Sequence, residues 1–351
     1  MERTGSWDLW VFAALIALGL VAPLLIYPVF LMKVLCFALF ACAFNLLIGY
    51  VGLLSFGHAM FFGFAAYVTG HLAKVGTVSL PYWLPLLGWN WVTIALPPLT
   101  PELAILGGTL VAALLGLIVG LIAIRRQGIY FAMVTLALAQ MVFFLCVQAK
   151  FTGGEDGIQA IPRRPMFGAL DVSNDFAFYY VVLAIFAIGF LVIYRTIHSP
   201  FGQVLKAIRE NEARAISLGY AVDRFKLIAF VLSAALAGLA GGTKAMVFQL
   251  ASLTDVTWQM SGEVVLMTLV GGMGTVFGPV VGASIIIYMQ NYLAGFGEWV
   301  LVIQGAIFVT TVMLFRRGIV GEIIGLINRS RTAKSSSHAD TTVPDQVKPA
   351  E

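Results

Sequence analysis

The length, composition and charge of the chain exclude an ordinary soluble domain. It has 351 residues, of which 60% are hydrophobic and only 11% are charged, whereas soluble domains carry about 25% charged residues. The net charge of +4 comes from basic residues that cluster beside apolar runs. This placement is typical of charges next to a membrane, so we expect the lipid bilayer as a partner and no nucleic acid.

Apolar runs long enough to cross a membrane follow one another along most of the chain. A helix needs about 20 apolar residues to cross about 30 Å of hydrocarbon. The sequence therefore predicts an all-α integral membrane protein, a polytopic helical bundle of about 8–10 spans. The candidate spans are residues 9–30, 33–50, 53–73, 103–124, 129–149, 177–195, 226–250, 261–275, 277–293 and 298–315.

Three of these runs need a separate interpretation. Residues 261–275 and 277–293 are short and rich in glycine, so we predict a broken or re-entrant pair there. The first run, residues 9–30, is long, and no small-residue cleavage site followed by a soluble domain comes after it. We therefore expect a retained span and not a signal peptide.

Basic residues predict which side of the membrane each link faces. Arg125 and Arg126 lie between two spans, and residues 195–226 form a basic polar stretch. Arg316 and Arg317 directly follow the last span. Because links rich in lysine and arginine stay in the cytoplasm, all three regions are expected there. An even number of spans places both termini on the same side.

The remaining polar segments divide the chain further. We predict a transmembrane domain at residues 1–328 and a disordered cytoplasmic tail at residues 329–351, which is polar and poor in apolar residues. The segment 74–102 carries several prolines and tryptophans. Because tryptophan prefers the membrane interface, we expect this segment to lie across the outer surface. Its tryptophans are Trp83, Trp89 and Trp91.

A cytoplasmic amphipathic helix is predicted within residues 198–224. Pro200 and Gly202 break the preceding span, and residues 203–218 then mix charged and apolar side chains with helical spacing. Gly219 follows at the position where glycine ends many helices. Two interpretations remain open. The segment is either a connector on the membrane surface or a coupling helix that binds a groove on a soluble partner.

Polar residues inside the predicted spans are candidates for a transport pathway. Asn45, Ser55 and His58 interrupt an apolar stretch, and a histidine in a membrane is costly unless it has a partner. A glycine-rich helix break can expose helix ends to a polar substrate. The glycines concerned are Gly271, Gly272 and Gly274. The alternative is structural, an interhelical hydrogen bond for the histidine and tight packing for the glycines. Lys244 is expected to extend its ammonium toward the interface.

The motifs of common enzymes are absent from the sequence. No Gly-x-x-x-x-Gly-Lys-Ser/Thr phosphate-binding loop occurs, and residues 241–244 have their glycines and lysine in the wrong order. The three cysteines lie inside apolar runs without metal-ligand spacing. We therefore predict no catalytic residue, no metal site and no cofactor in this chain, and we do not expect an enzyme.

Four sequence blocks occur in the order found in one transporter family. They are NLLIGYVGLLSFGHAMFFGFAAY at 45–67, YFAMVTLALAQ at 130–140 followed by TGGEDG at 152–157, HSPFGQVLKAIRENEARAISLGYAVDRFK at 198–226, and VGGMGTVFGPVVGA at 270–283. Together they resemble permeases of the branched-chain amino acid ABC importer family, whose members include permeases for urea and short amides. The segment 74–102 and the tail lie outside the resemblance.

The resemblance implies the pore-forming permease subunit of an ATP-binding-cassette importer in the bacterial inner membrane. It implies four kinds of partner: a second homologous permease, two ABC ATPase subunits that bind ATP and Mg²⁺, a periplasmic substrate-binding protein and the bilayer. The family's coupling loop has the form E-A-A-x-x-x-G. This assigns ATPase coupling to Glu212, Ala213, Arg214 and Gly219, with Arg214 in place of the second alanine.

The substrate and the docking surface stay open at this stage. Branched-chain or other amino acids are the first expectation, and urea or short amides are the alternative. An independent secondary transporter is a further alternative, whereas the missing catalytic clusters disfavour a membrane-embedded enzyme. Glu155 and Asp156 are candidates for docking the binding protein, because acidic and basic spots often meet at interfaces. The competing interpretation is a glycine-rich turn with solvated charges.

Overall fold

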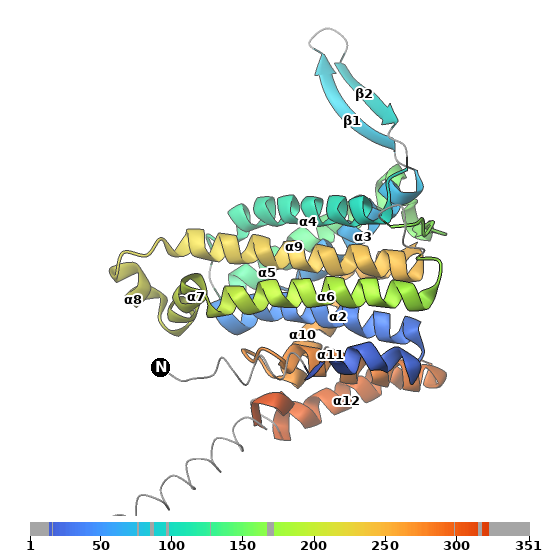
Figure 1. The fold of residues 1–351 in the computed structure, drawn as a ribbon. Helices are drawn as coiled ribbons and strands as arrows, with labels where there is room; N and C mark the ends of the chain where they lie inside the picture. Colours follow the sequence, from blue (N-terminus) through green and yellow to red (C-terminus); the bar gives the residue numbers. More distant parts are fainter. Residues whose placement is uncertain are drawn as a thin grey trace, which may run out of the picture.

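A computed structural model describes residues 14–15, 17–75, 77–84, 88–95, 98–126, 128–166, 172–297, 299–314 and 318–322. Helices dominate this part of the chain and run side by side in one bundle (Figure 1). Five helices are long and apolar enough to cross a membrane: Pro28–Val51, Pro101–Ala123, Ile129–Gln148, Asp175–His198 and Val222–Phe248. The expected all-α polytopic membrane fold is confirmed.

The helices follow the predicted spans closely. In chain order the helical elements are η1 (Ala22–Leu24), α2 (Pro28–Asn45), η2 (Leu46–Val51), α3 (His58–Lys74), α4 (Pro101–Ala123), α5 (Ile129–Gln148), η3 (Lys150–Thr152), η4 (Gly154–Asp156), α6 (Asp175–His198), α7 (Pro200–Glu210), α8 (Glu212–Ser217), α9 (Val222–Phe248), η5 (Leu253–Asp255), α10 (Trp258–Gly271), α11 (Gly278–Leu293), η6 (Ala294–Phe296) and α12 (Trp299–Leu314). Part of the predicted span 9–30, and all of the predicted tail 329–351, fall outside the described residues.

Small residues bring α3, α4 and α9 close together in the centre of the bundle. A Cβ on Gly241 of α9 would lie 1.9 Å from the carbonyl oxygen of Phe62 in α3. A Cβ on Gly238 would lie 2.3 Å from the Cβ of Ala112 in α4. Lipid cannot drive helices together as water does, so close backbone approach between small residues supplies much of the attraction. The other side of α4 exposes large apolar side chains suited to lipid, among them Leu106, Leu110, Leu114 and Leu121.

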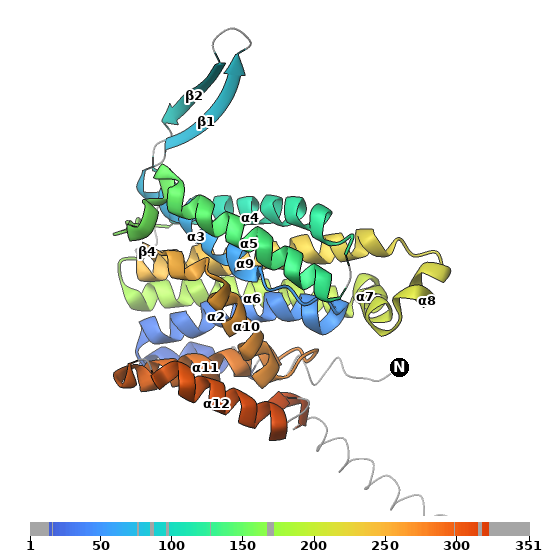
Figure 2. The same ribbon diagram turned by 180° about the vertical axis from the view of Figure 1, so that it is seen from behind.

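Two β-strands lie within the segment 74–102, which was predicted to lie across the outer surface. Strands β1 (Thr77–Leu84) and β2 (Gly88–Ala95) pair antiparallel with Val78 opposite Ile94. The hairpin leaves the helices at one end of the bundle and runs across their direction (Figures 1 and 2), so its place on the outer surface stays a prediction. β-Branched and aromatic residues make up half of β1 and most of β2, and these residues favour strands. A second, very short pair joins β3 (Ile158–Gln159) to β4 (Leu250–Ala251).

The predicted broken helix pair is present. Helix α10 ends at Gly271, residues 272–277 form a loop, and α11 begins at Gly278. At 14 residues, α10 is about 21 Å long, which is shorter than a full crossing requires. A Cβ on Gly271 would lie 1.9 Å from the carbonyl oxygen of Gly278, so the two helices approach closely beside the break.

The single amphipathic helix predicted at 203–218 is two helices. Asn211 is extended, with φ −156° and ψ 99°, and its side-chain oxygen accepts a hydrogen bond from the Arg214 amide at 3.0 Å. Asparagine is a favoured N-cap, so it ends α7 and starts α8. Gly219 follows α8 with φ +87°, as expected for a C-terminal glycine. Figure 1 shows α7 and α8 at the end of the bundle opposite the hairpin, where α4 also turns into α5. These two ends are called the α7 end and the hairpin end.

Candidate functional site

Asn45 holds the loop between α10 and α11 at the α7 end. Its side-chain nitrogen donates to the Thr275 carbonyl oxygen at 2.9 Å. Its side-chain oxygen accepts from the Gly274 amide at 3.0 Å. A Cβ on Gly49 would lie 2.3 Å from that same oxygen, so the glycine leaves room for the contact. One buried amide therefore ties the helix break to the end of α2.

Arg209, in the last turn of α7, reaches the same place. Its Nη1 donates a hydrogen bond to the carbonyl oxygen of Gly49 in η2. A Cβ on Gly274 would lie 3.1 Å from Nη1, and a Cβ on Gly52 would lie 3.2 Å from Cγ of Arg209. Both glycines also have positive φ, +75° and +82°, a region that other residues rarely adopt. We call Asn45, Gly49, Gly274, Thr275 and Arg209 the α7 junction.

The α7 junction unites residues that the sequence predicts separately. Asn45 and the glycines 271, 272 and 274 were expected near a pathway, and the structure brings them to one helix break. Arg209 is absent from the set that the sequence predicts. Its partner is a backbone carbonyl 160 residues away, and a charged residue on an amphipathic helix gives no signal for such a contact. A second cation of α7, the Lys206 ammonium, lies 5.8 Å from the centre of the Tyr50 ring in η2.

His58 lies deep in the bundle and is fully buried. Its Nε2 is 2.8 Å from Ser233 Oγ, which donates its own hydrogen to the Ala43 carbonyl oxygen. Because a hydroxyl has one hydrogen to donate, Nε2–H of the imidazole is the donor to Ser233. Four phenylalanine rings surround the imidazole with centroids 5.4–6.4 Å away: Phe40, Phe44, Phe61 and Phe230. The histidine thus connects α3 with α2 and α9 inside an aromatic cage.

Ser55 is also fully buried but does not join this cage by a hydrogen bond. Its Oγ accepts from the Gly57 amide at 3.4 Å, just before α3 begins. The next turn links to the broken pair, because the Ala59 amide donates to Ser261 Oγ of α10 at 2.9 Å. The starts of α3 and α10 therefore meet inside the bundle.

The tip of the α7 end is formed by α8. Glu212 pairs with Lys226 of α9 at 2.6 Å, whereas Ala213 and Arg214 are exposed. Among the described residues, no atom would lie within 4 Å of a Cβ on Gly219. Exposed apolar side chains lie beside these residues; Ile216 is 56% exposed, Leu218 69% and Tyr220 42%. Apolar groups that are exposed together often mark an interface, so this tip is suited to a partner protein.

Glu155 and Asp156 lie on the opposite, hairpin end. They occupy η4 within the TGGEDG turn, where both are exposed. Gly153 and Gly157 flank them with φ +78° and +67°, and a Cβ on Gly157 would lie 2.3 Å from the Ala251 carbonyl oxygen. The turn thus presents two carboxylates from a fixed backbone.

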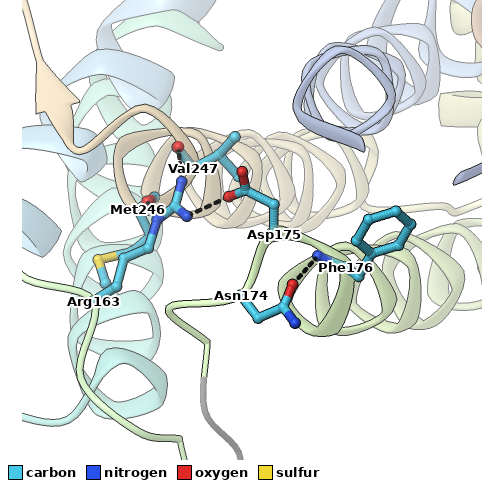
Figure 3. Close-up of polar contacts among 6 residues, drawn as sticks. All are labelled: Arg163, Asn174, Asp175, Phe176, Met246 and Val247. Carbon is cyan, nitrogen blue, oxygen red and sulfur yellow. Dashed lines mark hydrogen bonds and ion pairs between the residues drawn. The ribbon is translucent and has the colours of Figure 1, made fainter. Parts of the chain in front are cut away.

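An arginine clamp, centred on Arg163, fastens the hairpin end (Figure 3). Its Nη1 pairs with Asp175 Oδ1 at 2.7 Å, and its Nε and Nη2 donate to the carbonyl oxygens of Met246 and Val247. Those carbonyls lie in the last turn of α9, where backbone acceptors lack helical partners. Asp175 begins α6, where a negative charge is favourable. Arg163 therefore joins the end of α9 to the start of α6.

Lys244 does not extend toward the interface as the sequence predicts. Its ammonium is 2.6 Å from the carboxylate of Asp255, and both residues are buried. Burying a charge is costly unless it is paired, and the turn after α9 supplies the counter-charge. Ser252 donates a further hydrogen bond to Asp255 at 3.3 Å. Within the described residues, no group of three or more His, Cys, Asp or Glu side chains is placed to hold a metal ion.

Comparison with known proteins places the chain among transport permeases. The family model described as branched-chain amino acid transport system / permease component matches residues 27–312. The chain belongs to this family. All four resembling blocks fall within that range, so the expected family is confirmed. The apolar helices and the family together confirm a multi-pass membrane protein.

The curated relatives carry permease names. The high-affinity branched-chain amino acid transport system permease protein LivM of Salmonella typhimurium is 28% identical over 301 residues, covering 79% of this chain and 65% of the relative. LivM of Escherichia coli aligns to the same extent. The autoinducer 2 import system permease protein LsrC of Klebsiella pneumoniae is 28% identical over 195 residues, 54% of each chain. The chain thus spans about two thirds of the length of the LivM relatives. No solved structure matches it.

Proposed function

We propose that this chain is the pore-forming permease subunit of an ATP-binding-cassette importer that moves branched-chain or other amino acids across the bacterial inner membrane. One observation carries the proposal: a member of this permease family presents, at one end of its bundle, a short exposed helix beside a glycine with open space around it. Such a tip is suited to a groove on a soluble motor subunit.

The proposed assembly has a second homologous permease, two ATPase subunits and a periplasmic binding protein. Glu212, Ala213, Arg214 and Gly219 would face the ATPase, which alone would bind ATP and Mg²⁺. The α7 end and both termini would be cytoplasmic, since the basic residues of the α4–α5 link and of α7 and α8 gather there. The hairpin end would face the periplasm, with Glu155 available to the binding protein.

The substrate would pass near the helix break. Asn45, Ser55, His58 and the glycines of residues 271–274 remain the candidates that line or shape this route. A broken helix supports the proposal, because helix ends exposed at a break can face a polar substrate. This chain would supply no catalysis, and the binding protein would set most of the substrate choice.

Purification and reconstitution test the function together. The tagged chain, expressed with its genetic neighbours, should recover an ATPase and a second permease in detergent. In liposomes, the complex with its binding protein should accumulate L-leucine only when ATP is present on the α7 side. Uptake by the single chain without nucleotide would instead establish a secondary transporter.

The substrate needs its own experiment, because one relative is named for autoinducer 2 import and others for branched-chain amino acids. Calorimetric titration of the cognate binding protein with L-leucine, L-isoleucine, L-valine, urea and acetamide separates the alternatives. Binding of an apolar amino acid supports the proposal. Binding of urea or acetamide alone would replace the amino acid with a short amide.

A further inference from the structure

We propose that Arg209 is the positioning residue that transmits displacement of α7 and α8 to the loop between α10 and α11. The proposal rests on the proposed function, because it supposes that an ATPase moves α8. It concerns how that movement reaches the helix break, and it assigns the step to one side chain outside the coupling motif.

Helices α7 and α8 form one arm with the start of α9. Ile208 of α7, Ala215 of α8 and Val222 of α9 are buried against one another. Phe201 stacks on Phe225 with ring centroids 5.5 Å apart. The ion pair between α8 and α9 adds a polar link. Because packed side chains resist relative motion, a force applied at α8 displaces α7 as well.

Arg209 connects this arm to η2. The Gly49 carbonyl that it bonds belongs to the last turn of the helix formed by α2 and η2. Carbonyl groups at a helix C-terminus lack helical partners and attract a positive charge. The segment Leu46–Val51 is π-helical. Such turns are rare in proteins, and where they occur they often lie at functional sites. The backbone amides of Gly52 and Leu53 already bond the Leu47 carbonyl, so withdrawing the guanidinium would free the Gly49 carbonyl alone.

The same guanidinium lies against the helix break. A Cβ on Gly274 would come within 3.1 Å of Nη1, so the loop backbone and the arginine occupy adjoining space. Asn45 binds the same loop, through Gly274 and Thr275. Residues 318–322 also pack against this loop, since a Cβ on Gly318 would lie 2.3 Å from Gly272 Cα. A shift of Arg209 therefore acts on η2 and on the loop together.

The test measures movement of the loop directly. Met273 in the loop is 42% exposed, and all three native cysteines are buried. In the complete transporter, Met273→Cys should react with a polar maleimide at one rate without nucleotide and at another with ATP and vanadate. Arg209→Ala should remove that difference in rate, and it should lower uptake per ATP hydrolysed by about tenfold while basal ATPase activity persists.

Two further variants keep the test decisive. Arg209→Lys retains the charge and should restore assembly and part of the rate difference if Arg209→Ala impairs folding. Arg195→Ala, which removes an exposed arginine of α6, should change neither the rate difference nor uptake. A rate difference and an uptake that persist unchanged in Arg209→Ala and Arg209→Lys overturn the proposal. If no ATPase assembles with the parent chain, the proposed function itself fails, and this proposal fails with it.

Discussion

Two arginines fasten opposite ends of the bundle, and they differ in how completely they are bonded. Arg163 makes an ion pair and two hydrogen bonds to backbone carbonyls, and its guanidinium lies 5.0 Å from the centre of the Phe178 ring. Within the part of the chain that the structure describes, Arg209 makes one hydrogen bond, to Gly49, and lies beside Gly52 and Gly274. Both side chains complete the C-terminal end of a membrane helix.

The difference separates a fixed joint from a movable one. Moving Arg163 would break several contacts at once, so the ends of α6 and α9 are held rigidly together. Among the described residues, moving Arg209 breaks one hydrogen bond, and the neighbouring Gly52 and Gly274 present no side chain that holds the guanidinium in place. We infer that the hairpin end is the static part of the molecule and that the α7 end is the part that changes.

The largest expected effect follows from breaking the static joint. Arg163→Ala should destabilise the protein by about 3 kcal/mol, because hydrogen bonds to a charged group contribute about 1.5–3 kcal/mol each and Asp175 retains some solvent. Thermal unfolding of the complex in detergent measures the loss. Arg164→Ala is the matched control, since this exposed neighbour bonds only the Pro98 carbonyl among the contacts described. Equal stability of the two variants would refute the clamp.

The next largest loss of stability is expected from substitutions at His58, inside its cage of phenylalanine rings. His58→Ala should cost about 2–3 kcal/mol, since it removes a buried ring and leaves a cavity between phenylalanines. Ser233→Ala keeps the ring and removes the two hydrogen bonds of the hydroxyl, to His58 and to the Ala43 carbonyl, and should cost about 1–2 kcal/mol. Unfolding temperature and uptake should fall together if the histidine supports the fold. Lost uptake at unchanged unfolding temperature would place His58 in the pathway instead.

Asn45→Ala tests the movable joint with a smaller loss of stability. Two hydrogen bonds to the loop disappear, at a net contribution of about 1–2 kcal/mol, so uptake should fall by about tenfold with assembly intact. Asn291→Ala, on the exposed side of α11, provides the control in transport assays. Normal uptake in Asn45→Ala would mean that the loop does not need this tether.

Gly219 should show the smallest effect, and it separates backbone strain from contact with a partner. Gly219→Asn adds a side chain that tolerates the left-handed region, whereas Gly219→Val adds strain of about 1–3 kcal/mol. We expect both to insert normally and both to lower uptake per ATP, with Asn lowering it by about fivefold, equivalent to about 1 kcal/mol. A normal Asn variant would show that only the backbone matters at this position.

Much of the fold follows from the sequence because the bilayer imposes a simple requirement. Apolar runs of sufficient length become helices, and the glycines around residue 272 correctly predict a break. Local signals also succeed at Gly219, where the helix ends. They fail at Asn211, because asparagine at a cap and asparagine on an exposed helix face look alike without the backbone geometry.

Long-range contacts are the part that local patterns do not contain. Asn45 meets Thr275 across 230 residues of chain, and Arg209 meets a carbonyl group that any residue possesses. Lys244 differs, since its partner Asp255 follows only 11 residues later, and a counter-charge just beyond the span was a usable signal. The contacts of the α7 junction could therefore be identified only from the three-dimensional structure.

The most direct test of the movable joint sets Arg163→Ala beside Arg209→Ala in the same reconstituted transporter, with unfolding temperature and uptake per ATP measured on each. Arg163→Ala should unfold at a temperature lower by about 6 °C or more and should keep uptake per ATP in the folded fraction. Arg209→Ala should unfold within about 2 °C of the parent and should lose about tenfold in uptake per ATP. Equal losses of stability, with uptake per ATP unchanged in both, would contradict the distinction between a static and a movable joint.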